Sequence, residues 1–227
     1  MHKRARVVYK GYYNDAHGSV AIEVVNDHSR ISCVIDDVCF SGSEFSALCC
    51  HHGYTDAQLA RFSFYNEPNE MLCDCSFSLA LPQVLIETAS NSEISVMIDL
   101  RYTLGKARSN KTGGIDSEHV AMAVVVDGSR YEGSGDSFET AMIELYAQWK
   151  GRYVFKNCFG CALSDYHPVG NSSFGTMMCF LAQKETYMTI QTKEAFLQKL
   201  TDDFDTVQEI YCCDCFEIRK NHTGYRG

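Results

Sequence analysis

Apolar and polar residues alternate along much of the first 130 positions of the chain. Between Cys73 and Leu79 the alternation is strict, with cysteine, phenylalanine and leucine on one face and aspartate and serine on the other. This period of two is typical of a half-buried antiparallel strand. Six further segments rich in β-branched and aromatic residues also predict strands: Arg6–Tyr13, Ser19–Asn26, Arg30–Ile35, Val84–Thr88, Glu93–Leu104 and Glu118–Asp127.

Polar turn clusters separate these segments, and helical spacing occurs among them only at Ser43–Cys50, where we predict a short helical turn. The glycines of Gly133-Ser134-Gly135 predict a further turn. Closely spaced strands without helices between them favour a β-sandwich or a strongly curved antiparallel sheet.

The clearest helix is predicted to begin at Asp136. Its carboxylate can cap the free amides of the first turn, and Glu139 lies three residues further on, as in a capping box. Apolar residues then recur at helical spacing as far as Trp149. This helix divides the chain, and we predict an antiparallel β domain at 1–135 and a helix plus cysteine-rich α/β domain at 136–227.

The segment after this helix contains shorter predicted elements and one long loop. The loop, Cys158–Phe174, has seventeen residues, which is unusual in a folded domain unless something holds the loop in place. The remaining elements are predicted as a helix at Thr192–Asp202 and strands at Tyr153–Asn157, Thr176–Ala182, Thr186–Ile190 and Thr206–Cys212.

Composition places the chain among globular proteins, because 45% of its 227 residues are hydrophobic and 22% are charged. The basic N-terminus is not followed by the apolar region of a signal peptide, and no apolar run approaches the roughly 18 residues of a membrane span. We therefore expect a soluble cytoplasmic protein without a membrane partner. In that compartment, twelve cysteines indicate thiols or metal ligands rather than disulfides.

The formal charge of −9 is unevenly distributed along the chain. Residues 1–150 carry 20 acidic and 12 basic side chains, whereas residues 151–227 carry nine and eight. An acidic surface disfavours nucleic acid, whose phosphates require cationic contacts. It permits a basic protein partner, although a role in solubility explains the same charge.

Four cysteines in the last third of the chain are candidates for a tetrahedral metal site: Cys158, Cys161, Cys179 and one of Cys212, Cys213 or Cys215. The first two form a Cys-x-x-Cys loop, whose two sulfurs can bind one ion. Structural zinc is the favoured interpretation, because a small irregular domain gains folding free energy from a metal. The alternatives are buried thiols, a redox dithiol and a catalytic zinc.

Other groups of polar residues carry weaker indications. The ligand types in Cys49-Cys50-His51-His52 are adjacent in sequence and point apart on most backbones, so we interpret the cluster as chance. Asp165 and His167 could form an acid–base pair, but an Asx turn with an exposed imidazole is favoured. If the C-terminal tail folds back, Arg226 is a candidate ion-pair partner of Asp165 or of a carboxylate in the acidic half of the chain. No nucleophile elbow, phosphate loop, dinucleotide fingerprint or HExxH motif occurs in the sequence.

Several motifs in the last third of the chain are specific: Cys158-x-x-Cys161, Ser164-Asp165-Tyr166-x-Pro168-x-Gly170, Cys179-Phe180 and Thr223-Gly224-Tyr225-Arg226-Gly227. On these motifs, the C-terminal part resembles a family of bacterial proteins that is described only as a domain of unknown function. The resemblance is specific over 136–227 and loose over the β-rich part. It implies single cysteines at Cys158, Cys161, Cys179 and Cys213, and so favours Cys213 as the fourth ligand.

These observations predict an α+β protein with an N-terminal antiparallel β-sandwich-like domain and a C-terminal zinc-binding α/β element. The first functional hypothesis is a non-enzymatic bacterial protein that binds a basic partner, as immunity proteins or antitoxins do. The alternative is a metal- or thiol-dependent hydrolase that uses the loop after Cys161. An oxidoreductase with a Cys158–Cys161 disulfide is the third hypothesis.

Overall fold

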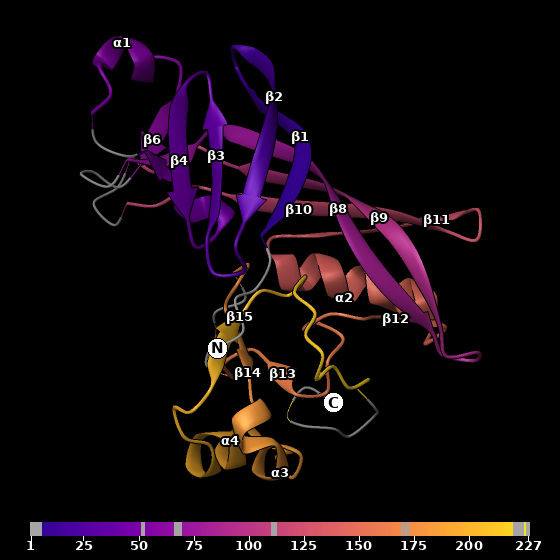
Figure 1. Ribbon diagram of the computed structural model, residues 1–227. Coiled ribbons are helices and arrows are strands. Elements are labelled where there is room, and N and C mark those ends of the chain that lie inside the picture. The colour runs from indigo at the N-terminus through magenta and orange to yellow at the C-terminus, as the bar shows by residue number, and fades with distance from the viewer. Residues whose placement is uncertain are drawn as a thin grey trace. The chain divides into compact units, whose positions relative to one another are not determined.

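Antiparallel strands dominate the computed structural model of the chain (Figure 1). The chain forms two compact units. The first consists of Met1–Leu81 and Met97–Leu145, and the second consists of Pro82–Val96 and Tyr146–Gly227. Each unit has its own core and is described by itself. The structure describes residues 6–50, 53–65, 70–109, 113–168, 170, 173–219 and 225.

In the described part of the chain, the main sheet has twelve strands in the order β11-β10-β9-β8-β1-β2-β3-β4-β5-β7-β6, with β12 paired to β8. The neighbouring pairs with a defined register are antiparallel. The strands are β1 (Val7–Asp15), β2 (Gly18–Asn26), β3 (Ile31–Ile35), β4 (Val38–Gly42), β5 (Cys49–Cys50), β6 (Ser63–Tyr65), β7 (Met71–Cys73), β8 (Cys75–Glu87), β9 (Ser92–Leu104), β10 (Glu118–Val126), β11 (Ser129–Gly135) and β12 (Tyr153–Phe155).

The connection between β7 and β8 requires this sheet to curl. Six strand-to-strand steps separate them in the sheet order, yet only Asp74 separates them in sequence. Asp74 has a positive φ of 51°, which allows the sharp change of direction. Aromatic rings fill the interior of the curl, where the ring centroid of Phe45 lies 5.5 Å from that of Phe77 and 4.8 Å from that of Tyr102. The α+β class predicted from the sequence is confirmed in a β-rich form, and the strands of this larger sheet form one curved layer.

Short helices accompany the sheet in the first unit. They are the 3-10 turn η1 (Phe45–Ala47), which lies in the segment predicted to be a helical turn, and α1 (Asp56–Leu59). The long helix α2 (Phe138–Trp149) begins two residues later than predicted, because the Ser137 hydroxyl rather than the Asp136 carboxylate accepts the amide of Thr140. Its apolar stripe is buried as predicted: Phe138, Ala141, Met142, Leu145 and Trp149.

The turn predicted at Gly133–Gly135 is wrong, because these residues form the end of β11 and pair with β10. Gly133 is needed there for close packing. A Cβ atom at Gly133 would lie 2.2 Å from the carbonyl oxygen of Ala141 and 2.7 Å from the amide nitrogen of Leu145. The strand can approach the backbone of α2 this closely only because the residue has no side chain.

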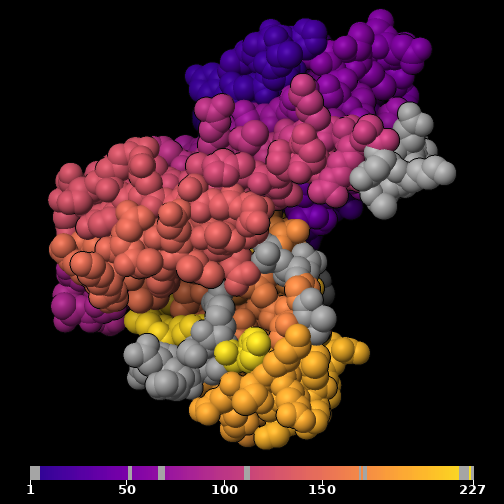
Figure 2. Space-filling view, turned by 180° about the vertical axis from the view of Figure 1, so that it is seen from behind, coloured from indigo at the N-terminus to yellow at the C-terminus, as the bar shows by residue number. Residues whose placement is uncertain are grey.

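The second unit contains a small three-stranded sheet and two short helices. The sheet consists of β13 (Ser164–Asp165), β14 (Met177–Cys179) and β15 (Asp205–Val207), with β14 in the centre. The 3-10 turn η2 (Leu181–Gln183) leads into α3 (Lys184–Tyr187), and α4 (Lys193–Lys199) follows. Figure 2 shows this part of the unit as a continuous orange surface. Among the described residues, no helix combines the length and apolar character needed to cross a membrane.

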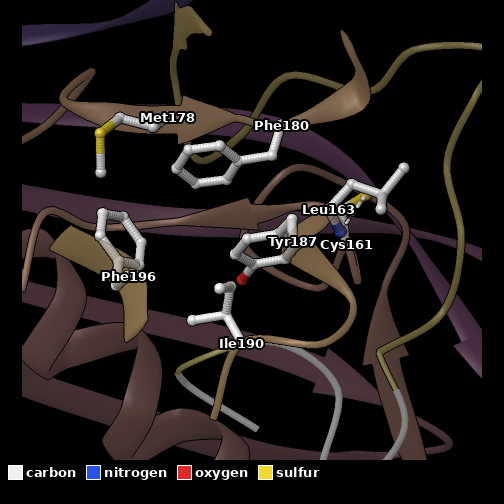
Figure 3. Packing of buried hydrophobic residues seen from close by; sticks show 7 residues of the cluster. All are labelled: Cys161, Leu163, Met178, Phe180, Tyr187, Ile190 and Phe196. Atoms are coloured by element: carbon white, nitrogen blue, oxygen red, sulfur yellow. Dashed lines mark hydrogen bonds between the residues drawn. The ribbon is translucent and has the colours of Figure 1, made fainter. Parts of the chain in front are cut away.

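The strand predicted at Thr186–Ile190 is wrong, because α3 and a turn occupy these positions. The two fully buried residues, Tyr187 and Ile190, are three positions apart, which is helical rather than strand spacing. The Tyr187 ring stacks on Phe180 with centroids 4.6 Å apart, and Phe196 of α4 meets Phe180 edge-on (Figure 3). This apolar cluster also contains Cys161, Leu163 and Met178.

Candidate metal centre

Five cysteines line one small cavity in the second unit. The cavity has a volume of about 10 Å³, which is close to the space that a single water-sized sphere needs. The four cysteines predicted as ligands are among them, and the fifth is Cys215, whereas Cys212 is not part of the lining. The lining residues are Asn157, Cys158, Cys161, Leu163, Ser164, Cys179, Leu181, Cys213, Cys215 and Phe216.

Backbone hydrogen bonds hold the cysteine loop (residues 158–161) on both sides. On one side, the amide of Cys158 donates to the carbonyl of Tyr211 at 2.6 Å. On the other, the amide of Ala162 donates to the carbonyl of Glu217 at 2.7 Å. These two contacts flank the tail turn (residues 212–216), so the chain between them must lie beside the cysteine loop. This arrangement explains how Cys213, more than fifty positions further along, reaches the same cavity.

The small sheet brings the third segment to the cavity. Ser164 of β13 pairs with Cys179 of β14, and the amide of Phe180 donates to the carbonyl of Leu163 at 2.8 Å. Because β13 begins three residues after Cys161, this pairing places Cys179 next to the cysteine loop. The segment predicted as a loop at 158–174 therefore contains the strand β13, and its pairing with β14 holds the segment in place.

Three of the sulfurs accept a hydrogen bond from the backbone amide two residues later. The amide of Leu163 lies 3.5 Å from Cys161 Sγ, the amide of Leu181 donates to Cys179, and that of Cys215 donates to Cys213. An amide that points at a sulfur stabilises the thiolate over the thiol. Thiolate is the form of cysteine that binds a metal. The three segments thus share one local geometry that suits ligands.

Burial acts against ionisation of the same thiols. It is the largest cause that raises the pKa of Cys158, and the neighbouring Cys179, Cys161 and Cys213 raise it further. Burial also raises the pKa of Cys179 and Cys213, against the lowering effect of their backbone amides. Without a cation, the cluster therefore favours neutral thiols. A bound divalent cation reverses this preference, because its charge stabilises adjacent thiolates.

The thiols line the cavity but do not already converge on one point. Within the described ranges, no three His, Cys, Asp or Glu side chains stand together in positions that could hold a metal ion. Neutral thiols have no electrostatic reason to converge, and four thiolates would require side-chain rotation toward the cation. Four sulfur donors in apolar surroundings are the ligand types of a structural zinc site.

A buried polar shell surrounds the cysteine loop. The hydroxyl of Tyr187 donates to Asp165 Oδ2 at 2.8 Å, and Arg219 donates through Nε to the carbonyl of Cys161 at 3.3 Å and through Nη2 to the carbonyl of Ser164. Burial and the adjacent Asp165 raise the pKa of Tyr187, so its hydroxyl remains a donor at neutral pH. Arg219 therefore links the C-terminal segment to the cysteine loop and to β13, and Tyr187 links α3 to β13.

Glu209 is a second buried acid in this shell, with none of its surface exposed. It accepts the hydroxyl of Tyr166 and the amide of Gly175, each at 2.8 Å. The long loop is therefore bound at its middle and its end to the segment that precedes the tail turn. The sequence carries no local signal for this role, because an isolated glutamate in a polar segment is normally exposed.

The two residues of the suggested acid–base pair differ in exposure. Asp165 is 2% exposed, and its carboxylate accepts the amide of the next residue, Tyr166, at 2.9 Å. His167 is exposed, and its ring meets Phe196 at 6.1 Å. In the Cys49-Cys50-His51-His52 cluster, Cys49 contacts the carbonyl of Ser41 and Cys50 contacts the carboxylate of Glu70. His51, His52 and the suggested ion-pair residue Arg226 lie outside the described residues.

The fold and the cavity define a β-rich α+β protein with a thiol cluster. The chain belongs to a family of unknown function, DUF6304, whose family model matches residues 7–164. The match includes Cys158 and Cys161 and ends before Cys179 and Cys213, so it lies mainly on the β-rich part rather than on residues 136–227, where the resemblance was expected to be specific. No curated protein and no solved structure matches the chain.

Proposed function

We propose that the second unit binds one structural zinc ion through Cys158, Cys161, Cys179 and Cys213. The observation that carries the proposal is that cysteines from three distant segments line one apolar cavity with a volume of about 10 Å³. Bound there, zinc would cross-link the cysteine loop, the end of β14 and the tail turn. Four sulfur ligands close the coordination sphere and leave no position for a substrate or a reactive water.

Zinc stoichiometry tests this proposal directly. The wild-type protein is expected to retain about one zinc per chain, and Cys158→Ser is expected to lose it, because one of four ligands is removed. Cys212→Ser is the matched control, since this exposed neighbour does not line the cavity. Elemental analysis and a free-thiol count give the result. Zinc-free wild-type protein, or equal zinc in Cys158→Ser, would contradict the proposal.

We further propose that the protein is non-enzymatic and binds a basic protein, in the manner of a bacterial immunity protein or antitoxin. Charge supports this role, because the first unit carries 18 acidic against 11 basic residues. Such a field attracts a basic partner over long range and weakens with salt. A pull-down at low salt is expected to recover a basic protein that dissociates at about 1 M salt; recovery of none would contradict the role.

A hydrolase that uses the loop after Cys161 is the less supported alternative. It requires Asp165 and His167 to act together on a substrate. The burial of Asp165 and its hydrogen bond from the Tyr187 hydroxyl favour a structural role for this carboxylate. A zinc site with three protein ligands and a bound water would favour the hydrolase instead.

A further inference from the structure

The cavity holds five thiols, one more than a tetrahedral zinc ion can bind. Three of them belong to fixed parts of the fold: Cys158 and Cys161 in the doubly anchored cysteine loop, and Cys179 at the end of β14. The other two, Cys213 and Cys215, both belong to the tail turn. The site is therefore asymmetric, with three positioned ligands and two candidates for the fourth position.

The two tail cysteines differ in exposure but not in access to the cavity. Cys213 is half-buried and Cys215 is exposed, yet both contribute to the lining. A turn joins them, in which the amide of Phe216 donates to the carbonyl of Cys213 at 3.2 Å. Burial raises the pKa of Cys213, and the proximity of Cys215 raises it further.

We propose that Cys213 and Cys215 are interchangeable fourth ligands, so that the zinc site exchanges one sulfur for the other within the tail turn. This inference rests on the proposed zinc site and adds to it a route for releasing the metal. Either Cys213 Sγ or Cys215 Sγ would bind zinc beside the three positioned cysteines, while the other would remain a thiol. A proton would pass from the incoming thiol to the outgoing thiolate, so the charge of the site would be unchanged.

Exchange of this kind has a functional consequence. A closed four-sulfur site normally releases zinc slowly, because a ligand must leave before another molecule can bind. An adjacent fifth thiol lowers this barrier, because it can take the place of the departing sulfur without the metal losing coordination. The exposed position of Cys215 also brings the exchange to the surface, where a chelator or a zinc-accepting thiol protein can compete for the ion.

Zinc content of four variants tests the proposal. Cys213→Ser and Cys215→Ser are each expected to retain about one zinc, with affinity reduced by no more than about tenfold, whereas the double variant is expected to lose at least about 100-fold. Cys158→Ser reports the proposed zinc site itself. If wild-type protein binds no zinc, the proposed function fails; if Cys213→Ser loses zinc as completely as Cys158→Ser, or the double variant retains it, only the exchange proposal fails.

Alkylation of the zinc-loaded wild-type protein provides a test that does not depend on the folding of variants. Cys212 and Cys215 are both exposed, but only Cys215 lines the cavity. Iodoacetamide labelling, read by mass spectrometry, is expected to modify Cys215 several-fold more slowly than Cys212 when zinc is bound. Removal of zinc is expected to abolish the difference. Equal labelling of Cys212 and Cys215 in both states would overturn the proposal.

Discussion

Glu118 is a carboxylate whose surroundings disfavour its charged form. It opens β10, where the hydroxyl of the fully buried Tyr102 donates to it. Burial raises its pKa and outweighs the lowering effect of that hydrogen bond, and the nearby Asp136 raises it further. Because its pKa is higher in the folded than in the unfolded state, the folded state binds its proton more tightly. The contribution of Glu118 to the stability of the folded state is therefore fully present below its unfolded-state pKa. It is lost as the pH rises through its raised folded-state pKa.

Replacement of Glu118 by glutamine is expected to stabilise the protein at pH 7. The amide oxygen still accepts the Tyr102 hydroxyl, and no buried charge remains, so the melting temperature is expected to rise by about 2 °C. The rise is expected to be smaller at pH 4, where Glu118 is more often protonated. Glu23→Gln, on the exposed face of β2, is the control and is expected to change little. A lower melting temperature at pH 7 in Glu118→Gln would contradict this account.

At the scale of secondary-structure elements, the contact of β11 with α2 depends on a missing side chain. Gly133→Ala is expected to destabilise the first unit by about 1–3 kcal/mol, because the added Cβ would contact the helix backbone, which cannot rotate away. Ser129→Ala, at the exposed start of the same strand, is the control, with an expected effect below about 0.5 kcal/mol. Chemical denaturation gives both values. Equal stability of the two variants would show that the helix adjusts without cost.

Long elements with a clear period could be predicted from the sequence, whereas elements that depend on distant partners could not. The strands around β1, β2 and β9 and the helix α2 each carry enough residues to establish a period of two or of 3.6. The strand β5 has two residues and β7 has three, so no period exists within them. Tyr187 and Ile190 were misassigned because β-branched and aromatic residues suggested a strand, while their burial follows helical spacing.

The candidate metal centre was predictable to a similar extent. Residue type and spacing were sufficient to identify Cys158 and Cys161, and strand ends suggested Cys179 and the tail cysteines. No pattern in the sequence places both Cys213 and Cys215 at the cavity, because their position depends on the hydrogen bonds at Tyr211 and Glu217 on each side of the tail turn. The burial of Glu209 likewise depends on partners more than thirty positions away.

At the scale of the whole molecule, the two units differ in what stabilises them. The first unit has an aromatic core within a curled sheet, with five of its rings, those of Tyr13, Phe40, Phe45, Phe77 and Tyr102, fully or almost fully buried. In the second unit, the segments around the cysteine loop are short, and they depend on backbone contacts, buried polar groups and, in our proposal, zinc. A structural metal contributes folding free energy to the segments that it cross-links.

Removal of zinc by a chelator is therefore expected to loosen the second unit and leave the first unit unchanged. Hydrogen exchange of the zinc-loaded protein, before and after chelation, measures this segment by segment. Amides of residues 158–164, 177–181 and 209–219 are expected to exchange at least about tenfold faster after chelation, because their hydrogen bonds hold the cavity walls. Amides of β1 to β4 serve as the internal control, since they belong to the sheet core. An equal increase of the exchange rate throughout both units would show that the metal stabilises the molecule as one cooperative body. An unchanged exchange rate around the cysteine loop would show that the ion does not stabilise this part of the fold.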